Sequence, residues 1–252
     1  PIYVPTNRVF RVVFDDKSTL VAKVSSYGSY FLFAEDHDRL ARCAALLRHT
    51  RWAGFLADVL SIDKRPYTWY DGRCWCAFYG EVQRAESLPR ILPPADVAGL
   101  AHEIARFHHA CGEIAPALPA VSNSVKGDAI HLFDQLTNPF APRNFGLPPE
   151  DIGVLARFTH ELLLHLESVH YDEWEKIPIL VDWNLGNFSV TRDEGGVRLF
   201  SRWDYDWFRI ESRLLDFYFL SRVSSSTGDR TSFTYSPHTD RKSTRLNSSH
   251  VS

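Results

Sequence analysis

Asp182-Trp-Asn-Leu-Gly-Asn187 is the densest polar cluster of the chain, and its interpretation decides the fold. It follows directly on the apolar run Ile177–Val181, which predicts a short buried strand. Loops at strand ends commonly carry catalytic groups. Aspartate and asparagine are also ordinary turn residues, so the cluster alone leaves both a catalytic and a simple turn interpretation open.

A predicted hairpin brings two further carboxylates next to this cluster. Strand-like runs at Phe188–Val190 and Val197–Trp203 flank the turn Asp193-Glu-Gly-Gly196, and Asp204-Tyr-Asp206 follows. Carboxylate and amide oxygens suit Mg²⁺, which binds a few protein oxygens together with phosphate oxygens. An acid that stays off the metal can accept a hydroxyl proton. The pattern therefore favours a magnesium–nucleotide site.

The first 80 residues have the pattern of an antiparallel sheet with one inserted helix. Arg8–Phe14 and Thr19–Val24 alternate and are rich in branched residues, which predicts two strands joined by a turn. Glu35–His49 has apolar residues at helical spacing. Two more strand-like runs lie near Ala57–Ile62 and Thr68–Tyr79.

The remainder of the chain is mainly helical. A helix begins at Pro93-Pro94, a second long helix is predicted over Ile152–His170, and a last one over Arg213–Val223. Asn138–Pro149, with four prolines, is predicted to be a loop. The fold class is therefore α+β, with a sheet lobe over residues 1–83 and a helical lobe over 84–239 that carries the polar hairpin.

Composition narrows the function classes. The 252 residues are 44% hydrophobic and 23% charged, with no apolar run long enough for a membrane helix. A net charge of −3 gives no field of one sign to attract nucleic acid. Four scattered cysteines predict neither a disulfide scaffold nor a zinc site. With no signal segment at the start, we expect a cytoplasmic protein without a nucleic-acid or membrane partner.

The last residues differ sharply from the rest. Residues 240–252 are polar and aperiodic, and 240–250 resemble the translation of a common sequencing-library adaptor. We therefore expect them not to be native and the natural protein to continue beyond Thr239, the alternative being a natural polar tail.

The order of these motifs resembles the aminoglycoside phosphotransferase and choline kinase family, whose fold is protein-kinase-like. Asp182 with Asn187 five residues later, then Asp204 after a hairpin and Asp216 in the next helix, is similar to the family's catalytic pattern. Arg213 lies where choline-kinase-like members often carry arginine. Further similar stretches are Asn7–Val12, Val21-Ala-Lys-Val24 and the hinge-like Ala77–Val82.

The resemblance implies a role for each matching position. Asp182 would be the catalytic base, Asn187 and Asp204 would bind Mg²⁺, and Lys23 would neutralise ATP phosphates. Backbone groups of Gly80, Glu81 and Val82 would meet the adenine, Asp216 would fix the catalytic loop, and Trp207 could line an acceptor pocket. Asp206 would either assist the metal or face solvent. The implied activity is transfer of the γ-phosphoryl group of ATP to a hydroxyl of a small molecule.

Three departures from the family pattern support an alternative, a catalytically inactive kinase-like domain that binds a nucleotide or a partner. Leu180-Val181 replaces the usual His-Gly before the catalytic aspartate, and Tyr3–Asn7 lacks phosphate-loop glycines. The glutamate that normally pairs with the lysine falls near Cys43, which leaves Glu35 or Asp38 as substitutes. The identity of the acceptor is open.

Overall fold

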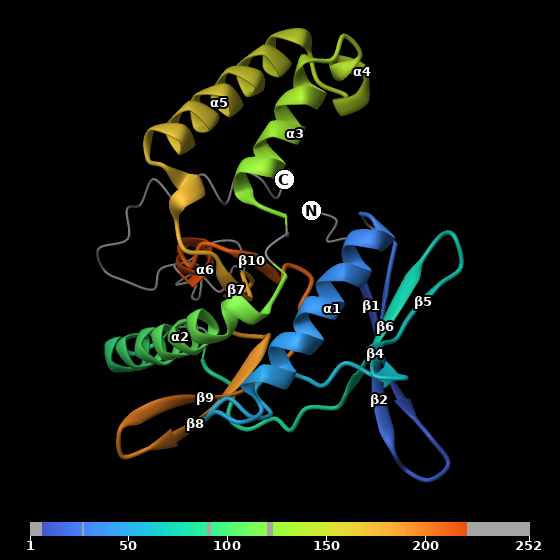
Figure 1. Ribbon diagram of the computed structural model, residues 1–252, viewed down its shortest axis with the longest axis vertical. Helices are drawn as coiled ribbons and strands as arrows, with labels where there is room; N and C mark the ends of the chain where they lie inside the picture. Colours follow the sequence, from blue (N-terminus) through green and yellow to red (C-terminus); the bar gives the residue numbers. More distant parts are fainter. Residues whose placement is uncertain (1–6, 27, 90–91, 120–122, 221–252) are drawn as a thin grey trace.

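The computed structural model describes residues 7–26, 28–89, 92–119 and 123–220, apart from the side chains of 7 and 218–220. Its first part is a four-stranded antiparallel sheet of order β1-β2-β6-β5, with α1 beside it (Figure 1). The elements of this part are β1 (Asn7–Val13), β2 (Thr19–Ser25), α1 (Tyr30–Leu47), β3 (Ser61–Ile62), β4 (Arg65–Pro66), β5 (Thr68–Tyr70) and β6 (Trp75–Gly80). The predicted sheet with one helix is therefore confirmed.

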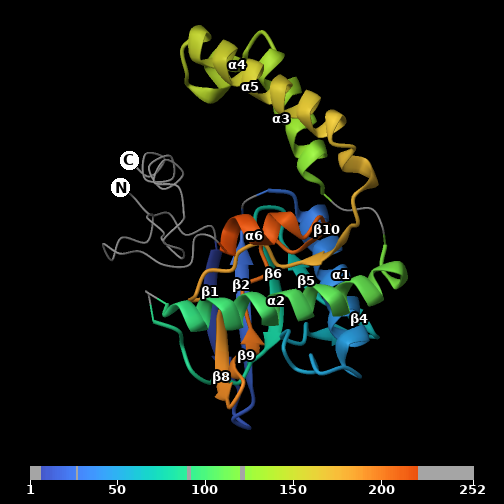
Figure 2. The same cartoon turned by 90° about the vertical axis from the view of Figure 1, so that its left-hand side faces the viewer.

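The second part is helical and contains two small antiparallel strand pairs, β8 with β9 and β7 with β10. Its helices α3, α4 and α5 project away from the rest of the molecule (Figure 2). Its elements are α2 (Pro94–Ile114), α3 (Val125–Thr137), α4 (Ala141–Phe145), α5 (Pro149–Ser168), β7 (Ile177–Ile179), β8 (Phe188–Asp193), β9 (Gly196–Arg202), β10 (Arg209–Glu211) and α6 (Leu214–Leu220), with single 3₁₀ turns at Ala115–Ala117 and Tyr171–Glu173. None of the helices in the described ranges has the length and apolarity needed to cross a membrane.

The predicted loop at Asn138–Pro149 is wrong in part, because it contains the short helix α4. Pro142 lies in the first turn of α4, where a missing backbone N–H costs nothing, and Gly146 ends it in the left-handed conformation at φ 66°. Proline and glycine thus act here as helix-boundary residues. Helix α3 and strand β10 were not among the sequence predictions.

A continuous apolar core joins the sheet to the helical part. Trp52, Phe55 and Phe107 pack edge to face, with ring centroids 5.2–5.3 Å apart. Phe107 on α2 also meets the fully buried Trp183 of the polar loop. Aromatic side chains contribute large buried areas, so this cluster ties the position of the 182–187 loop to α2.

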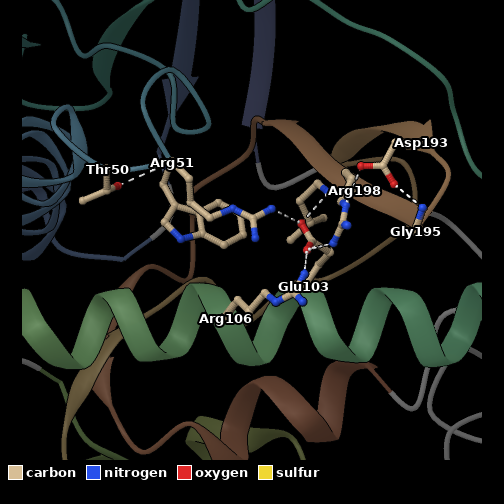
Figure 3. A network of polar contacts seen from close by, with 9 residues as sticks. Thr50, Arg51, Glu103, Arg106, Asp193, Gly195 and Arg198 are labelled. Atoms are coloured by element: carbon tan, nitrogen blue, oxygen red, sulfur yellow. Dashed lines mark hydrogen bonds and ion pairs between the residues drawn. The ribbon is translucent and has the colours of Figure 1, made fainter.

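A buried carboxylate holds the β8–β9 hairpin on α2. Glu103 on α2 has no exposed surface and pairs with Arg51, Arg106 and Arg198 at 2.8–3.0 Å (Figure 3). Burial alone would raise the pKa of Glu103, but the three guanidinium groups lower it overall. Because Arg51 follows α1 and Arg198 lies on β9, one acid links three parts of the chain.

Candidate functional site

The loop after β7 presents Asp182 and Asn187 side by side. The Asn187 amide nitrogen donates to Asp182 Oδ2 at 3.0 Å, and the Asn184 backbone N–H donates to Oδ1 at 3.2 Å. Both Asp182 and Asn187 are half-buried. These bonds orient the carboxylate while leaving part of it accessible, as a group that accepts a proton from a ligand requires.

The backbone immediately before Asp182 adopts a conformation that favours glycine. Val181 has φ 63°, an unusual value for a β-branched residue that costs about 1–2 kcal/mol. Its side chain is 3% exposed, and burying a valine contributes about 1.5–3 kcal/mol. The chain therefore retains the glycine-like turn without a glycine.

Asp216 on α6 holds this turn in place. Its Oδ1 accepts the Val181 N–H at 2.6 Å, and its Oδ2 accepts from His108 Nε2 of α2 at 2.7 Å. Asp216 has no exposed surface. The structure thus places Asp216 against the backbone of the loop that it was expected to fix.

A buried arginine holds both ends of the same loop. Arg202, at the end of β9, donates from Nη2 to the carbonyl of Asp182 at 2.8 Å and from Nη1 to that of Asn187 at 3.0 Å. The Trp203 N–H also donates to the Asn187 carbonyl, at 2.9 Å. Asp204 follows Trp203 in the sequence, so this hydrogen bond brings the backbone of Asp204 close to that of Asn187.

Lys23 on β2 reaches across to this region. Its Nζ lies 2.5 Å from Asp204 Oδ1 and also contacts Asp206 Oδ1. Burial alone would raise the pKa of Asp204, but the Lys23 ammonium outweighs it, so that pKa lies below its ordinary value. The lysine and the two acids are 181 residues or more apart in sequence, and the fold brings them into one cluster.

A cavity of about 330 Å³ opens between the sheet and the Asp204 region; we call it the interlobe cavity. Its size is in the range of small-molecule sites. It is lined by Val9, Arg11, Val21, Lys23, Ala57, Tyr79, Gly80, Glu81, Val82, Arg84, Trp203, Asp204 and Tyr205. The four residues expected to meet a nucleotide, Lys23 and Gly80–Val82, therefore line one cavity together with Asp204, and their roles remain predictions.

Glu81 and Arg84, two residues that line this cavity, already have side-chain partners within the protein. Glu81 accepts two hydrogen bonds from Arg11, at 2.8 and 2.9 Å, so its side chain is turned to β1. Arg84 stacks over the Trp203 ring at 4.4 Å from the centroid. The Gly80 N–H also has a partner, the Asp58 carbonyl at 2.8 Å.

Sequence reasoning missed a buried histidine behind the cavity. His37 on α1 donates from Nδ1 to the carbonyl of Phe33 at 2.6 Å, so its Nε2 accepts from the Tyr79 hydroxyl. Burial lowers the pKa of His37 to about 4, and the charge of Lys23 acts in the same direction. A neutral histidine therefore joins α1 to β6. A lone histidine within a helix pattern carries no sequence signal for this contact.

This histidine makes the protein less stable in mild acid. The pKa of His37 is about 4 in the folded chain against 6.5 ordinarily, so the unfolded chain takes up the proton first. The free energy of unfolding is expected to fall as the pH drops from 6.5 to 4, by on the order of 3 kcal/mol from this group. For His37→Gln, the free energy of unfolding measured in urea should change less steeply with pH over that interval. His102→Gln, at an exposed site on α2, should keep the wild-type slope; equal slopes in all three would contradict the assignment.

The donor set fits a magnesium ion. The Asn187 amide nitrogen is used by Asp182, so the oxygen of the same amide is the atom that can face a metal. The carboxylates of Asp204 and Asp206 already meet a cationic group, Lys23 Nζ. In the described part of the chain, no group of three or more His, Cys, Asp or Glu side chains is arranged to hold a metal by itself. Oxygen atoms of carboxylates and amides are the ligands that magnesium prefers.

Comparison with known proteins shows structural similarity only. No protein-family model matches the sequence, and no curated protein matches it. Solved structures of aminoglycoside phosphotransferases do: the GDP and kanamycin complex of APH(2")-IIia (TM-score 0.55, 17% identity) and the GDP complex of wild-type aminoglycoside 2'-phosphotransferase-IIIa (0.52, 17%). Each match covers 84% of this chain and 68% of the other.

A second kind of kinase gives the same result. Amicoumacin kinase hAmiN, in complex with AMP-PNP, Ca²⁺ and Ami, matches with a TM-score of 0.53 and 14% identity, over 82% of this chain. The chain spans only 58% of the length of that kinase. These structural matches confirm the expected fold. The chain has the protein-kinase-like fold of small-molecule phosphotransferases.

Proposed function

We propose that this protein transfers the γ-phosphoryl group of ATP to a hydroxyl group of a small molecule. The observation that carries the proposal is the ion pair between Lys23 and Asp204 at 2.5 Å, which joins the sheet to the loop region at the wall of the interlobe cavity. Asn187 is tied to the same segment, because its carbonyl accepts the Trp203 N–H at 2.9 Å. Phosphoryl transfer requires mainly positioning and electrostatic stabilisation, and these residues would provide both.

Each residue would act through a stated atom. The Asp182 carboxylate, oriented by Asn184 and Asn187, would accept the proton of the acceptor hydroxyl. Lys23 would place its ammonium on the nucleotide phosphates, and backbone groups of Gly80–Val82 would contact the base. Asn187 and Asp204 would hold magnesium, which supplies neutralisation of phosphate charge.

The small molecule that accepts the phosphoryl group would bind between α3 and α5, next to the loop that carries Asp182. A second cavity of about 330 Å³ lies there, next to the Asp182 loop; we call it the helical cavity. It is lined by Val125, Asp128, Ala129, Leu132, Thr159, Leu162, Val181, Trp207, Arg209 and Leu215. Asp128 is paired with Arg209 at 3.0 Å, so a neutral, largely apolar alcohol matches this lining better than a polycation.

A thermal-shift experiment tests the nucleotide part of the proposal. ATP with Mg²⁺ is expected to raise the Tm, because a ligand that binds only the folded chain stabilises it. An excess of about a hundredfold over Kd contributes about 2.7 kcal/mol, which is about 5–10 °C for a chain of this size. Asp204→Asn should lose the magnesium-dependent part of the shift.

The control for this experiment is Asp134→Asn, an exposed acid on α3 far along the chain from the cluster. It should shift like the wild type. No rise in Tm for the wild-type protein with ATP and Mg²⁺ would refute the proposal. A rise without ATP consumption across a panel of alcohols would instead support the inactive, nucleotide-binding alternative.

A further inference from the structure

The lysine of the candidate site has two carboxylate partners, and both lie on one short segment. Lys23 Nζ contacts Asp204 Oδ1 and Asp206 Oδ1. The lysine side chain is 6% exposed, so it is held in a nearly water-free position. A buried ammonium that loses its anionic partner pays a large desolvation cost, so at least one of the two acids must stay with it.

Helix α1 does not supply that partner among the described residues. Glu35 and Asp36 both pair with Arg39, at 3.0 and 2.8 Å. Asp38 pairs with Arg42 at 3.3 Å. Neither Glu35 nor Asp38, the two substitutes considered from the sequence, is placed on Lys23.

A buried polar residue of α1 that contacts the sheet near Lys23 is His37, and it is uncharged. His37 is bonded through Nδ1 to Phe33 and through Nε2 to the Tyr79 hydroxyl, so both of its ring nitrogens are used. It can seat α1 on β6, but it cannot act as the counter-ion of an ammonium group. The charge that balances Lys23 therefore comes from the Asp204–Asp206 segment.

With magnesium and ATP bound, the two acids would differ in their tasks. In the proposed function Asp204 would turn an oxygen to the metal, and its contact with Lys23 would weaken. The segment carries two negative charges against one ammonium, so a second carboxylate remains for the lysine. Asp206 is the more buried of the two, with 23% of its side chain exposed against 36%.

We propose that Asp206 is the positioning residue of Lys23, in place of an acid on α1; the inference rests on the proposed function. Lysine orientation is then set by the same segment that carries the metal ligand Asp204. A displacement of α1 would leave the ion pair intact, because no carboxylate of this helix takes part in it.

Calorimetric titration of ATP at saturating Mg²⁺ tests this proposal. Asp206→Asn is expected to weaken ATP binding about tenfold to a hundredfold, the usual cost of losing a hydrogen-bonded charge partner. Asp206→Glu should recover part of the affinity, because it keeps the carboxylate. Glu35→Gln and Asp38→Asn, at exposed acids of α1, should bind ATP like the wild type.

A double-mutant cycle separates a role through Lys23 from a general structural role. In a Lys23→Ala background, Asp206→Asn should cause no further loss of ATP affinity, because the group that it positions is absent. Additive losses would overturn the proposal. An ATP affinity of Asp206→Asn equal to that of the wild type would also overturn the proposal. So would a variant that only needs more Mg²⁺ to reach the wild-type ATP affinity, because that result would make Asp206 a metal ligand.

Failure of the proposed function would look different. In that case the wild-type protein itself would bind no ATP while melting cooperatively, and the role of Asp206 would fall with it. An affinity measured for the wild type but unchanged in Asp206→Asn would reject only the positioning role.

Discussion

Asp182→Asn is expected to lower kcat of phosphoryl transfer by about 10²–10⁴-fold while leaving the Kd of ATP with Mg²⁺ nearly unchanged. The carboxylate is the proton acceptor in the proposed reaction, whereas the amide is not basic. The substitution keeps the shape of the side chain and one acceptor oxygen, so it retains one of the two hydrogen bonds from Asn184 and Asn187, and Arg202 still holds the backbone of the loop. The loop should therefore stay folded, and the loss should lie in the chemical step.

Coupled measurement of ADP release, with and without a panel of apolar and cationic alcohols, provides the rates. Asp134→Asn serves again as the control, because its side chain is exposed on α3. Equal turnover in Asp182→Asn and in the wild type would remove Asp182 from the reaction. A parallel loss of ATP affinity would indicate a collapsed loop instead of a missing base.

Asp216→Ala is expected to lower the free energy of unfolding by about 3–5 kcal/mol, the usual cost of removing one partner from a buried polar pair. The substitution strands two buried donors, the N–H of Val181 and Nε2 of His108, which the carboxylate accepts at 2.6 and 2.7 Å. An unpaired buried donor costs its desolvation energy. Val181 would also lose the contact that holds it at φ 63°.

Urea unfolding of Asp216→Ala beside Asp134→Ala measures this effect. The control should change the free energy of unfolding by less than about 0.5 kcal/mol, as exposed substitutions commonly do. Asp216→Asn, which retains one acceptor oxygen for one of the two donors, should fall between the two. A loss below about 1 kcal/mol in Asp216→Ala would show that the anchor contributes little.

The local elements could be predicted where periodicity is strong. The β1–β2 hairpin, α2 and the β8–β9 hairpin follow from alternation or helical spacing together with clear turn residues. Helix α4 was interpreted as a loop because Pro142 and Gly146 are turn residues as well as helix boundaries. Local pattern does not separate these two uses.

The contacts of the candidate site could be predicted only in part. The motif Asp182 to Asn187 and the anchor Asp216 are recognisable from the resemblance to the phosphotransferase family, and the Asp216 carboxylate accepts the N–H of Val181, the residue before Asp182. The partners of Lys23 and the bond between His37 and Tyr79 depend on how α1 packs on the sheet. No sequence spacing encodes that packing, which explains why Glu35 and Asp38 seemed equally suitable.

Asp216, which anchors the loop before Asp182, is synthesised after the loop itself. Asp216 follows Val181 by 35 positions, so a growing chain carries Asp182 and Asn187 well before the carboxylate that fixes their backbone. Domains generally fold as units during synthesis, so the contacts of this loop form only after α6 is available. In a nascent chain that ends before α6, the loop that carries Asp182 and Asn187 therefore lacks its hydrogen bond to Asp216. The two side chains take up their final positions only when α6 packs against the loop.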